Sequence, residues 1–254
     1  MPEEDQPIIL AIDSCSLPGS ISLCRGNEIL FEQMLETGLS HSLTLLETVD
    51  EALTAGGADI CDVDIFAVSS GPGSFTGLRI GLATVKAFGA TFNSPCVGVP
   101  TLHAIAFSAG PSPRTLAMLP AGRGEIFAQL LNITEDGQVF ELSEAVHLPP
   151  LKAIEKFSSI RNLRFAGKGA SENFDIFRTK GESVGRPIVT FDVQGGQPYP
   201  EGEQWSFFQG LYVLSTSVAM LALKEWFGGG RAGAGDLLPN YVRPSDPELK
   251  LLCR

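Results

Sequence analysis

Residue types that build metal sites are scarce in this chain. Its 254 residues include three histidines, His41, His103 and His147, which lie dozens of residues apart without a His-x-x-x-His pair. A metal site with ordinary ligand spacing is therefore not predicted. The five cysteines are scattered and lack any Cys-x-x-Cys pair, which argues against a zinc site and indicates a reduced, cytoplasmic protein.

Basic residues are also in the minority, with 18 Lys and Arg against 29 Asp and Glu and a formal net charge of −11. This balance argues against independent nucleic-acid binding, whose affinity depends on phosphate neutralisation. The acidic start of the chain is unlike a signal peptide. The apolar run at residues 205–227 is long enough to span a membrane, but it is interrupted by polar side chains and lacks basic flanks, so we interpret it as a buried or interface helix.

What the chain does contain is a glycine-rich turn between two apolar segments. Residues 65–69 are typical of a buried strand and residues 78–92 of a helix, so the loop from Gly71 to Gly77 joins a strand's carboxyl end to a helix amino end. Free N–H groups and the helix dipole favour an anion there, which makes Gly71, Gly73 and Ser74 candidate cofactor-binding residues.

The spacing of this loop matches neither of the two common nucleotide-binding motifs. No Gly-Lys-Ser or Gly-Lys-Thr follows, and glycines at 71, 73, 77 and 81 do not fit the dinucleotide fingerprint. The alternative is that Gly71-Pro72-Gly73 forms a tight turn and that Gly77 and Gly81 let the helix approach a neighbour. Both interpretations remain open at this point.

The first part of the chain predicts three strands at residues 8–13, 20–23 and 28–35, paired antiparallel because their connections are short. A helix follows over residues 40–54, with Leu43, Leu46, Val49 and Leu53 on one face. The glycine loop, its helix, a strand at 96–99 and a helix over 101–108 complete a first lobe at residues 1–108.

The remaining residues, 109–254, predict a second lobe that begins with another three-strand meander at 115–119, 125–133 and 138–141. Residues 181–202 are rich in Gly and Pro and predict a loop. The long helix expected over residues 205–227 is predicted to pack back toward the first lobe.

The glycine loop, Ser70-Gly71-Pro72-Gly73-Ser74-Phe75-Thr76-Gly77-Leu78-Arg79-Ile80-Gly81, resembles the hallmark of the bacterial TsaB (YeaZ) family. Further matches are Ile9 to Ser14, Ser40-His41-Ser42, Gly98 to Leu102 and the tail Pro239-Asn240-Tyr241-Val242-Arg243. The resemblance is strong over residues 8–105 and thin between 140 and 235. One stretch departs from the family pattern: Pro120 to Phe127 lacks the usual aspartate, and its arginine is displaced by one residue.

The resemblance implies an α/β protein with two actin-like lobes, each a mixed sheet flanked by helices, as in the sugar-kinase-like ATPase superfamily. It implies a non-catalytic partner of the TsaD threonylcarbamoyl transferase, acting with a TsaE-like ATPase in making threonylcarbamoyladenosine in tRNA. The chain would contact tRNA only through the complex and would form a homodimer when alone. No tightly bound cofactor is implied, although ATP or ADP could be held at the complex interface.

The helix after the glycine loop carries a stripe of mostly small residues at four-residue intervals, Gly77, Gly81, Val85 and Gly89. Such a stripe lets another helix come close, and apolar residues cover much of the remaining circumference. We predict that this stripe, with Leu43 and Leu46 of the preceding helix, forms the partner interface. The alternative is an ordinary core helix within one chain.

Two enzyme classes compete with the partner interpretation. Asp13 followed by Ser14 and Ser16 resembles the first phosphate loop of actin-like ATPases, which predicts a stand-alone ATPase or phosphotransferase using Asp13 and the Gly71 to Gly77 loop. The usual glycine two residues after the aspartate is replaced by Cys15. A peptidase has less support, because no His-Glu-x-x-His motif occurs and no nucleophile has an evident histidine partner. We therefore expect no catalytic residues.

Overall fold

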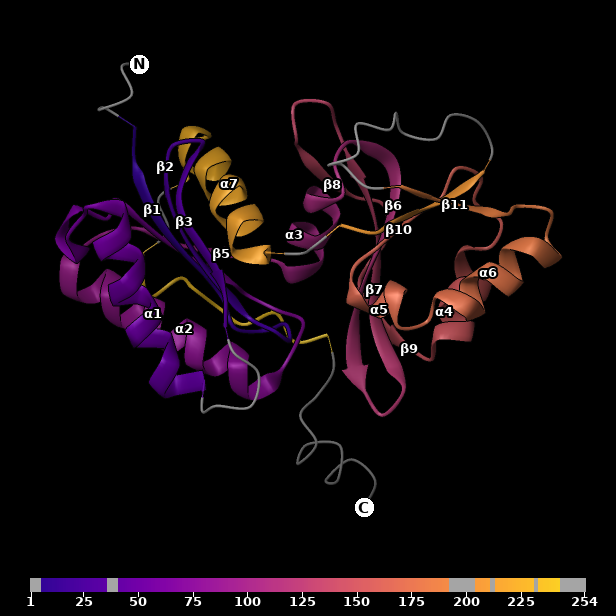
Figure 1. The fold of residues 1–254 in the computed structure, drawn as a ribbon, viewed down its shortest axis with the longest axis horizontal. Coiled ribbons are helices and arrows are strands. Elements are labelled where there is room, and N and C mark those ends of the chain that lie inside the picture. Colours follow the sequence, from indigo (N-terminus) through magenta and orange to yellow (C-terminus); the bar gives the residue numbers. More distant parts are fainter. Residues whose placement is uncertain (1–5, 36–40, 192–203, 211–212, 231–232, 243–254) are drawn as a thin grey trace. The chain divides into compact units, whose positions relative to one another are not determined.

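The computed structural model describes residues 6–35, 41–191, 204–210, 213–230 and 233–242. The chain forms two compact units, the first comprising Met1–Ala104 with Val213–Tyr241 and the second Ile105–Tyr212 with Val242–Arg254. In each unit a mixed β-sheet is flanked by helices (Figure 1). Within the described ranges, no helix is long and apolar enough to cross a bilayer.

The sheet of the first unit has the strand order β3-β2-β1-β4-β5. Its strands are β1 (Ile8–Asp13), β2 (Ser20–Arg25), β3 (Glu28–Met34), β4 (Ile65–Ser69) and β5 (Cys96–Val99). The first three pair antiparallel, which confirms the meander predicted from their short connections, and β4 and β5 continue parallel to β1. The carboxyl ends of β1 and β4 therefore lie next to each other at one edge of the sheet.

Helices cover both faces of this sheet (Figure 1). Helices α1 (His41–Gly56) and α2 (Phe75–Phe92) pack on one face, and α7 (Leu214–Phe227) packs on the other. A single turn of 3-10 helix (Ile60–Asp62) precedes β4, and α3 (Thr101–Ser108) follows β5. The hydroxyl groups of Ser215 and Thr216 lie 2.7 and 2.8 Å from Ser22 Oγ, which fastens the start of α7 to β2.

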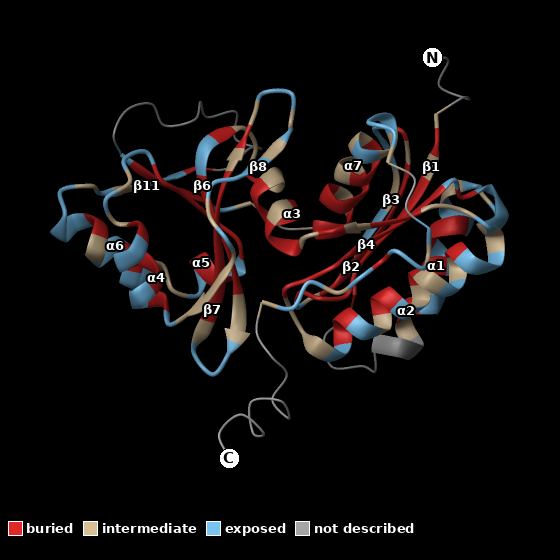
Figure 2. Ribbon diagram, turned by 180° about the vertical axis from the view of Figure 1, so that it is seen from behind, coloured by how far each residue is buried: buried red, intermediate tan, exposed pale blue. Residues whose placement is uncertain are grey.

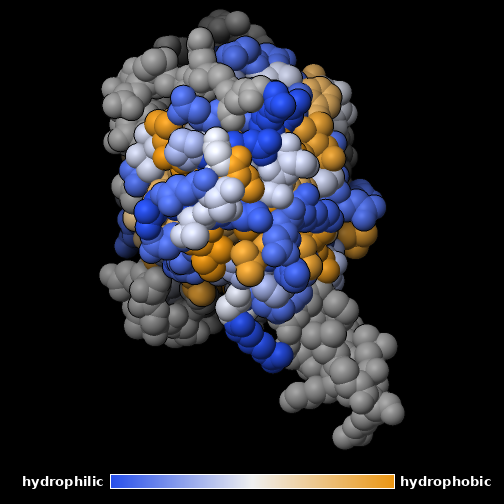
Figure 3. Space-filling view, turned by 90° about the vertical axis from the view of Figure 1, so that its right-hand side faces the viewer, coloured by the Kyte–Doolittle hydropathy of each residue, from blue (hydrophilic) through white to orange (hydrophobic). Residues whose placement is uncertain are grey.

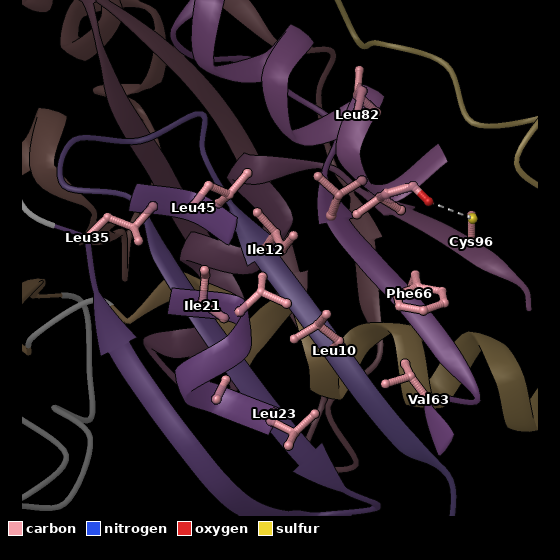
Figure 4. Packing of buried hydrophobic residues seen from close by; sticks show 14 of the residues in the cluster. Leu10, Ile12, Ile21, Leu23, Leu35, Leu45, Val63, Phe66, Leu82 and Cys96 are labelled. Carbon is pink, nitrogen blue, oxygen red and sulfur yellow. Dashed lines mark hydrogen bonds between the residues drawn. The ribbon is translucent and has the colours of Figure 1, made fainter. Parts of the chain in front are cut away.

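The core of the first unit lies between the sheet and the α1–α2 layer (Figures 2 and 4). Leu10, Ile12 and Phe66 of the central strands are fully buried, and Leu45 of α1 points toward them. The apolar face of α1 is shifted from the predicted one, since Leu45 is buried whereas Leu46 is 53% exposed. Val49 and Leu53 do lie in the core, as predicted.

The second unit contains a seven-stranded sheet of order β11-β12-β10-β6-β7-β8, with β9 pairing on β7. Antiparallel pairing of β6 (Ser112–Gly122), β7 (Glu125–Ile133) and β8 (Val139–Glu141) confirms the second meander. The remaining strands are β9 (Val146–Leu148), β10 (Arg164–Ala166), β11 (Ile188–Phe191) and β12 (Trp205–Phe208), the last three mutually parallel with β6.

Three helices belong to the second unit: α4 (Pro150–Phe157), α5 (Lys168–Ser171) and α6 (Phe174–Ser183). They enclose a second core in which Phe165 stacks on Phe177 and meets Trp205 edge to face, both at ring-centroid distances of 5.4 Å. On the face shown in Figure 3, small apolar patches are separated by hydrophilic residues. Such scatter is ordinary for a solvent-facing surface.

Two predictions along this part of the chain are wrong. The helix expected over 205–227 begins at Leu214, because Trp205–Phe208 forms the buried strand β12 between β10 and β11. The loop expected over 181–202 contains the end of α6 and the strand β11, and its residues 192–202 lie outside the described part. Aromatic residues favour a strand when a partner strand is available, which sequence periodicity alone does not reveal.

Candidate functional site

The glycine loop lies where the sequence places it, between the carboxyl end of β4 and the amino end of α2. Ser70 N–H donates to Val99 O over 2.8 Å, and Thr101 N–H donates to Gly71 O over 2.8 Å, so the loop is tied to β5 and to the start of α3. Gly71 has φ of +103°, a conformation that side chains disfavour. This glycine is therefore required by the backbone geometry.

The amino end of α2 is partly satisfied from within the chain. Ser74 is the N-cap residue, and its Oγ accepts the Gly77 N–H over 3.3 Å. Ser74 N–H donates to Cys15 O over 2.8 Å. The carbonyl oxygen of Ser14 lies so close to Gly77 that a Cβ there would come within 1.8 Å of it. Two carbonyl oxygens of the β1–β2 loop thus face the helix end at which a phosphate would have to approach.

Asp13 is fully buried at the end of β1, and its hydrogen-bond donors come from the loop that follows it. Cys15 N–H and Ser16 N–H donate to Oδ1 over 3.1 and 3.4 Å, and the Ser16 hydroxyl donates to Oδ2. Burial raises the pKa of the Asp13 carboxyl, against the opposing effects of the Ser16 and Ser69 hydroxyls and of these amides. The carboxyl therefore organises the turn from Cys15 to Gly19 as an Asx turn does.

Ser14 and Cys15 pack against the glycine loop and do not line an opening beside it. Ser14 Oγ donates to Gly77 O over 2.8 Å, and Cys15 Sγ donates to Ser69 O over 3.2 Å. A Cβ on Gly73 would come within 2.6 Å of the Cys15 Cβ, so the Cys15 side chain closes the space between the two loops. Burial holds the pKa of the Cys15 thiol well above its usual range, and the charge of Asp13 raises it further. The thiol is therefore a poor nucleophile.

The buried state of Asp13 has a measurable consequence for stability against pH. A carboxyl whose pKa is raised on folding favours the folded state most at low pH, and this contribution is lost as pH rises from the unfolded value of 3.8 through the folded pKa. We expect Asp13→Asn to remove this dependence. Urea unfolding at pH 4.5 and 7.5 should show that the free energy of unfolding of wild type, relative to that of the variant, falls as pH rises. If wild type and variant differ in this free energy by the same amount at both pH values, the pKa of Asp13 is not raised.

The predicted small-residue stripe is buried inside the chain. Gly77 and Gly81 lie against the Ser14 backbone and hydroxyl, while Val85 and Gly89 pack over Cys96. Figure 4 shows the last of these contacts, the hydrogen bond from Cys96 Sγ to Val85 O. This corrects the expectation that the stripe itself is presented to a partner: its four residues let α2 lie close to the sheet of its own unit.

The exposed side of α2 also carries small residues, which the sequence reasoning missed. Ala83, Ala87 and Ala90 are exposed at intervals of three and four residues. Leu46 of α1 is exposed on the same helical layer, whereas the Leu43 side chain lies outside the described residues. The only signal in the sequence was that α2 is rich in small residues on two faces.

The end of the chain contributes to the glycine loop through a segment that we call the strap, residues 237–241. Leu237 is buried in the core of the first unit. Asn240 N–H donates to Ser70 O over 2.7 Å, and the Tyr241 ring stacks on Phe75 at 5.2 Å. The Arg79 guanidinium carbon lies 4.0 Å from the Phe75 ring centroid. The sequence indicated this segment only through its match to the tail motif.

His147 and the stretch that departs from the family pattern lie in the second unit. His147 Nε2 on β9 is 2.9 Å from Glu125 Oε2 on β7, within the stretch that departs from the family pattern. Gly122, Arg123 and Gly124 of that stretch form the β6–β7 turn with positive φ angles. Within the described ranges, no group of three or more His, Cys, Asp or Glu side chains is placed to hold a metal ion.

Comparison with known proteins finds similarity to proteins of tRNA modification. Residues 36–186 match the family model described as "TsaD: tRNA N6-adenosine threonylcarbamoyltransferase". The chain is 32% identical over 122 residues to the tRNA threonylcarbamoyladenosine biosynthesis protein TsaB of Escherichia coli, with 47% of this chain and 52% of that protein aligned. The match therefore spans about half the length of this relative.

A longer but weaker match joins the chain to TsaB of Haemophilus influenzae, at 28% identity over 203 residues, covering 74% of this chain and 84% of the relative. Among solved structures, YeaZ from Pseudomonas aeruginosa superposes with a TM-score of 0.69 at 20% identity over 92% of this chain and 99% of that one. This likeness shows the fold: an α/β protein with two mixed sheets flanked by helices, as expected from the sequence.

Proposed function

Because the chain belongs to the TsaB (YeaZ) family, we propose that it is a non-catalytic partner of a TsaD-type transferase in the synthesis of threonylcarbamoyladenosine in tRNA. In this proposal the transferase performs the chemistry, and the chain supplies a surface that the transferase needs. A TsaE-like ATPase completes the cytoplasmic complex, and a homodimer forms when the partner is absent.

The main support for the proposal is that the side chains of the candidate site pack against each other within the chain. Asp13 is bonded to its own loop, the Cys15 side chain fills the space beside Gly73, and the Ser74 amide is bonded to Cys15 O. A phosphate approaching α2 would meet the carbonyl oxygens of Ser14 and Cys15, which repel it. Catalytic use of Asp13 or this loop would require the two loops to separate.

One observation supports anion binding by the glycine loop. Among the described residues, the Phe75 and Thr76 N–H groups at the start of α2 have no acceptor. This feature is why the stand-alone ATPase stays as the alternative, with Asp13, Ser14, Gly71, Gly73 and Ser74 as its candidate nucleotide contacts. A nucleotide held between this chain and the transferase would be compatible with either function.

For the partner surface we propose the solvent-facing side of the α1–α2 layer, at Leu46, Ala83 and Ala87. Small residues on α2 allow a partner helix to come close, and the exposed Leu46 on α1 offers apolar area. This surface takes the place of the buried Gly77, Gly81, Val85 and Gly89 stripe. The helices are the two that the sequence predicts for the interface, but the contact uses the exposed side of α2 in place of its glycine side.

The charge distribution supports leaving tRNA contact to the other subunits. Between Arg25 and Arg79 the sequence contains no lysine or arginine. On the exposed side of α1 stand Glu47, Asp50 and Glu51, none of which makes an ion pair within the described residues. A phosphate backbone would be repelled from this side of the first unit.

Reconstitution tests the proposed function directly. Purified chain, transferase and ATPase are mixed with unmodified tRNA, and threonylcarbamoyladenosine is measured by nucleoside mass spectrometry with each protein omitted in turn. We expect modification only when the chain is present, and no ATP hydrolysis by the chain alone. Full modification without the chain, or hydrolysis by the isolated chain that Asp13→Ala abolishes, would overturn the proposal in favour of the alternative.

A further inference from the structure

The strap occupies the position that α/β proteins usually reserve for a ligand, at the carboxyl end of a central strand beside a helix amino end. Asn240 N–H donates to the Ser70 carbonyl that ends this strand region, and Asn240 O lies against Gly71, where a Cβ would come within 2.6 Å of it. The main chain of the strap is thus fitted to the glycine loop, and Gly71 provides the room for it.

The two ends of the strap are held very differently. Leu237 is 3% exposed and reaches over Gly98, where a Cβ would come within 2.7 Å of the Leu237 Cδ1. Beyond it, Leu238 is 71% exposed and Tyr241 is 45% exposed. Within the described residues, one hydrogen bond from Asn240 and one ring stack on Phe75 hold this outer part.

We propose that the strap is a two-part clasp on the glycine loop. Leu237 is its fixed anchor, and Asn240 with Tyr241 is a releasable closure that holds the loop and the first turn of α2 in the geometry observed. Segments fastened by few contacts open locally without unfolding the domain, whereas a side chain in the core opens only with it. Because the Phe75 ring contacts both the Tyr241 ring and the Arg79 guanidinium group, the closure also fixes the start of α2.

Amide hydrogen exchange in the isolated chain, followed residue by residue by NMR, tests the clasp. The reporters are the N–H groups of Asn240, Thr101 and Ser74, which bond to Ser70, Gly71 and Cys15 respectively. We expect Tyr241→Ala to speed exchange at these three amides by about 10-fold or more, with exchange in β1 unchanged. Tyr241→Phe, which keeps the ring, and Leu238→Ala, which changes an exposed neighbour, should both behave as wild type.

Two results would overturn the clasp. Wild-type exchange at the three reporter amides in Tyr241→Ala would mean that the stack does not hold the loop. Parallel acceleration throughout β1 would mean that the strap opens only by global unfolding, so that no separate closure exists.

The coupling of the closure to partner binding rests on the proposed function and is tested separately. We expect Tyr241→Ala to weaken association with the transferase by about 10-fold, because the first turn of α2 must then be ordered on binding. Unchanged association despite faster exchange would remove this coupling. If wild-type chain does not bind the transferase, the proposed function fails, and the exchange experiment on the isolated chain still decides the clasp.

Discussion

Gly77→Ala is expected to destabilise the first unit by at least about 3 kcal/mol, although alanine is the better helix former. In an open helix this substitution stabilises by roughly 0.5–1 kcal/mol, because glycine loses more backbone entropy on folding. Here the added Cβ would lie 1.8 Å from the Ser14 carbonyl oxygen, a backbone atom that cannot rotate away. The sign of the change therefore reports whether α2 lies directly on the β1–β2 loop.

Urea unfolding measured by circular dichroism provides the test, with two companion variants. Gly81→Ala should cost less, since its Cβ would first meet Ser14 Oγ, the end of a side chain that can turn aside. Gly235→Ala is the matched control, because its Cβ position has no neighbour within 4 Å and its φ is not positive. A Gly77→Ala protein as stable as Gly235→Ala would show that the contact between α2 and the loop is not as described.

This contact also changes which experiments can probe the partner interface. If the glycine stripe lay on the surface, Gly81→Leu would be the substitution that blocks a partner helix. A leucine at this buried position would instead collide with Ser14 and with Val68 Cγ2, 3.2 Å from the Cβ position. Lost association in such a variant would report damage to the fold, so interface substitutions belong on the exposed side of α2.

The first unit was largely predictable because its sequence signals are local. Strands β1, β4 and β5 are short apolar runs bounded by turn residues, and Asn93 ends α2 with a left-handed conformation. The environment of the α2 glycines was harder to predict. Leu78, Leu82 and Val85 are buried on the same side as the glycines. Because Ile80, Phe88 and Phe92 extend the apolar surface around the helix, periodicity did not reveal that the glycines face the loop after Asp13.

The second unit was less predictable because its elements depend on contacts distant in sequence. Trp205 to Phe208 belongs to an apolar run that continues into α7, and it forms a strand because β10 and β11 lie on either side of it. Trp205 Nε1–H donates to Ile160 O over 2.9 Å, a contact 45 residues away. The strap also depends on distant contacts. Its motif is recognisable in the sequence, but its packing on the glycine loop follows from the tertiary fold.

Under the proposed function, Ala87→Arg is expected to lower the affinity for a TsaD-type transferase by about 100-fold while leaving the isolated chain folded. Ala87 is exposed on α2, so a long charged side chain is tolerated in the free protein. At a close helix–helix contact the same side chain would hold the partner away and leave a charge without water. Ala83→Arg, one turn earlier on the same side, should act in the same direction.

The matched control is Thr179→Arg, which places the same side chain on the exposed surface of α6 in the second unit. Affinities for the three variants come from titration calorimetry with purified transferase, and unfolding curves verify that each is folded. If Ala87→Arg and Ala83→Arg bind as tightly as Thr179→Arg, the exposed side of α2 is not the contact. Since the glycine side of the same helix is closed by the loop after Asp13, that result would move the partner surface away from α2 altogether.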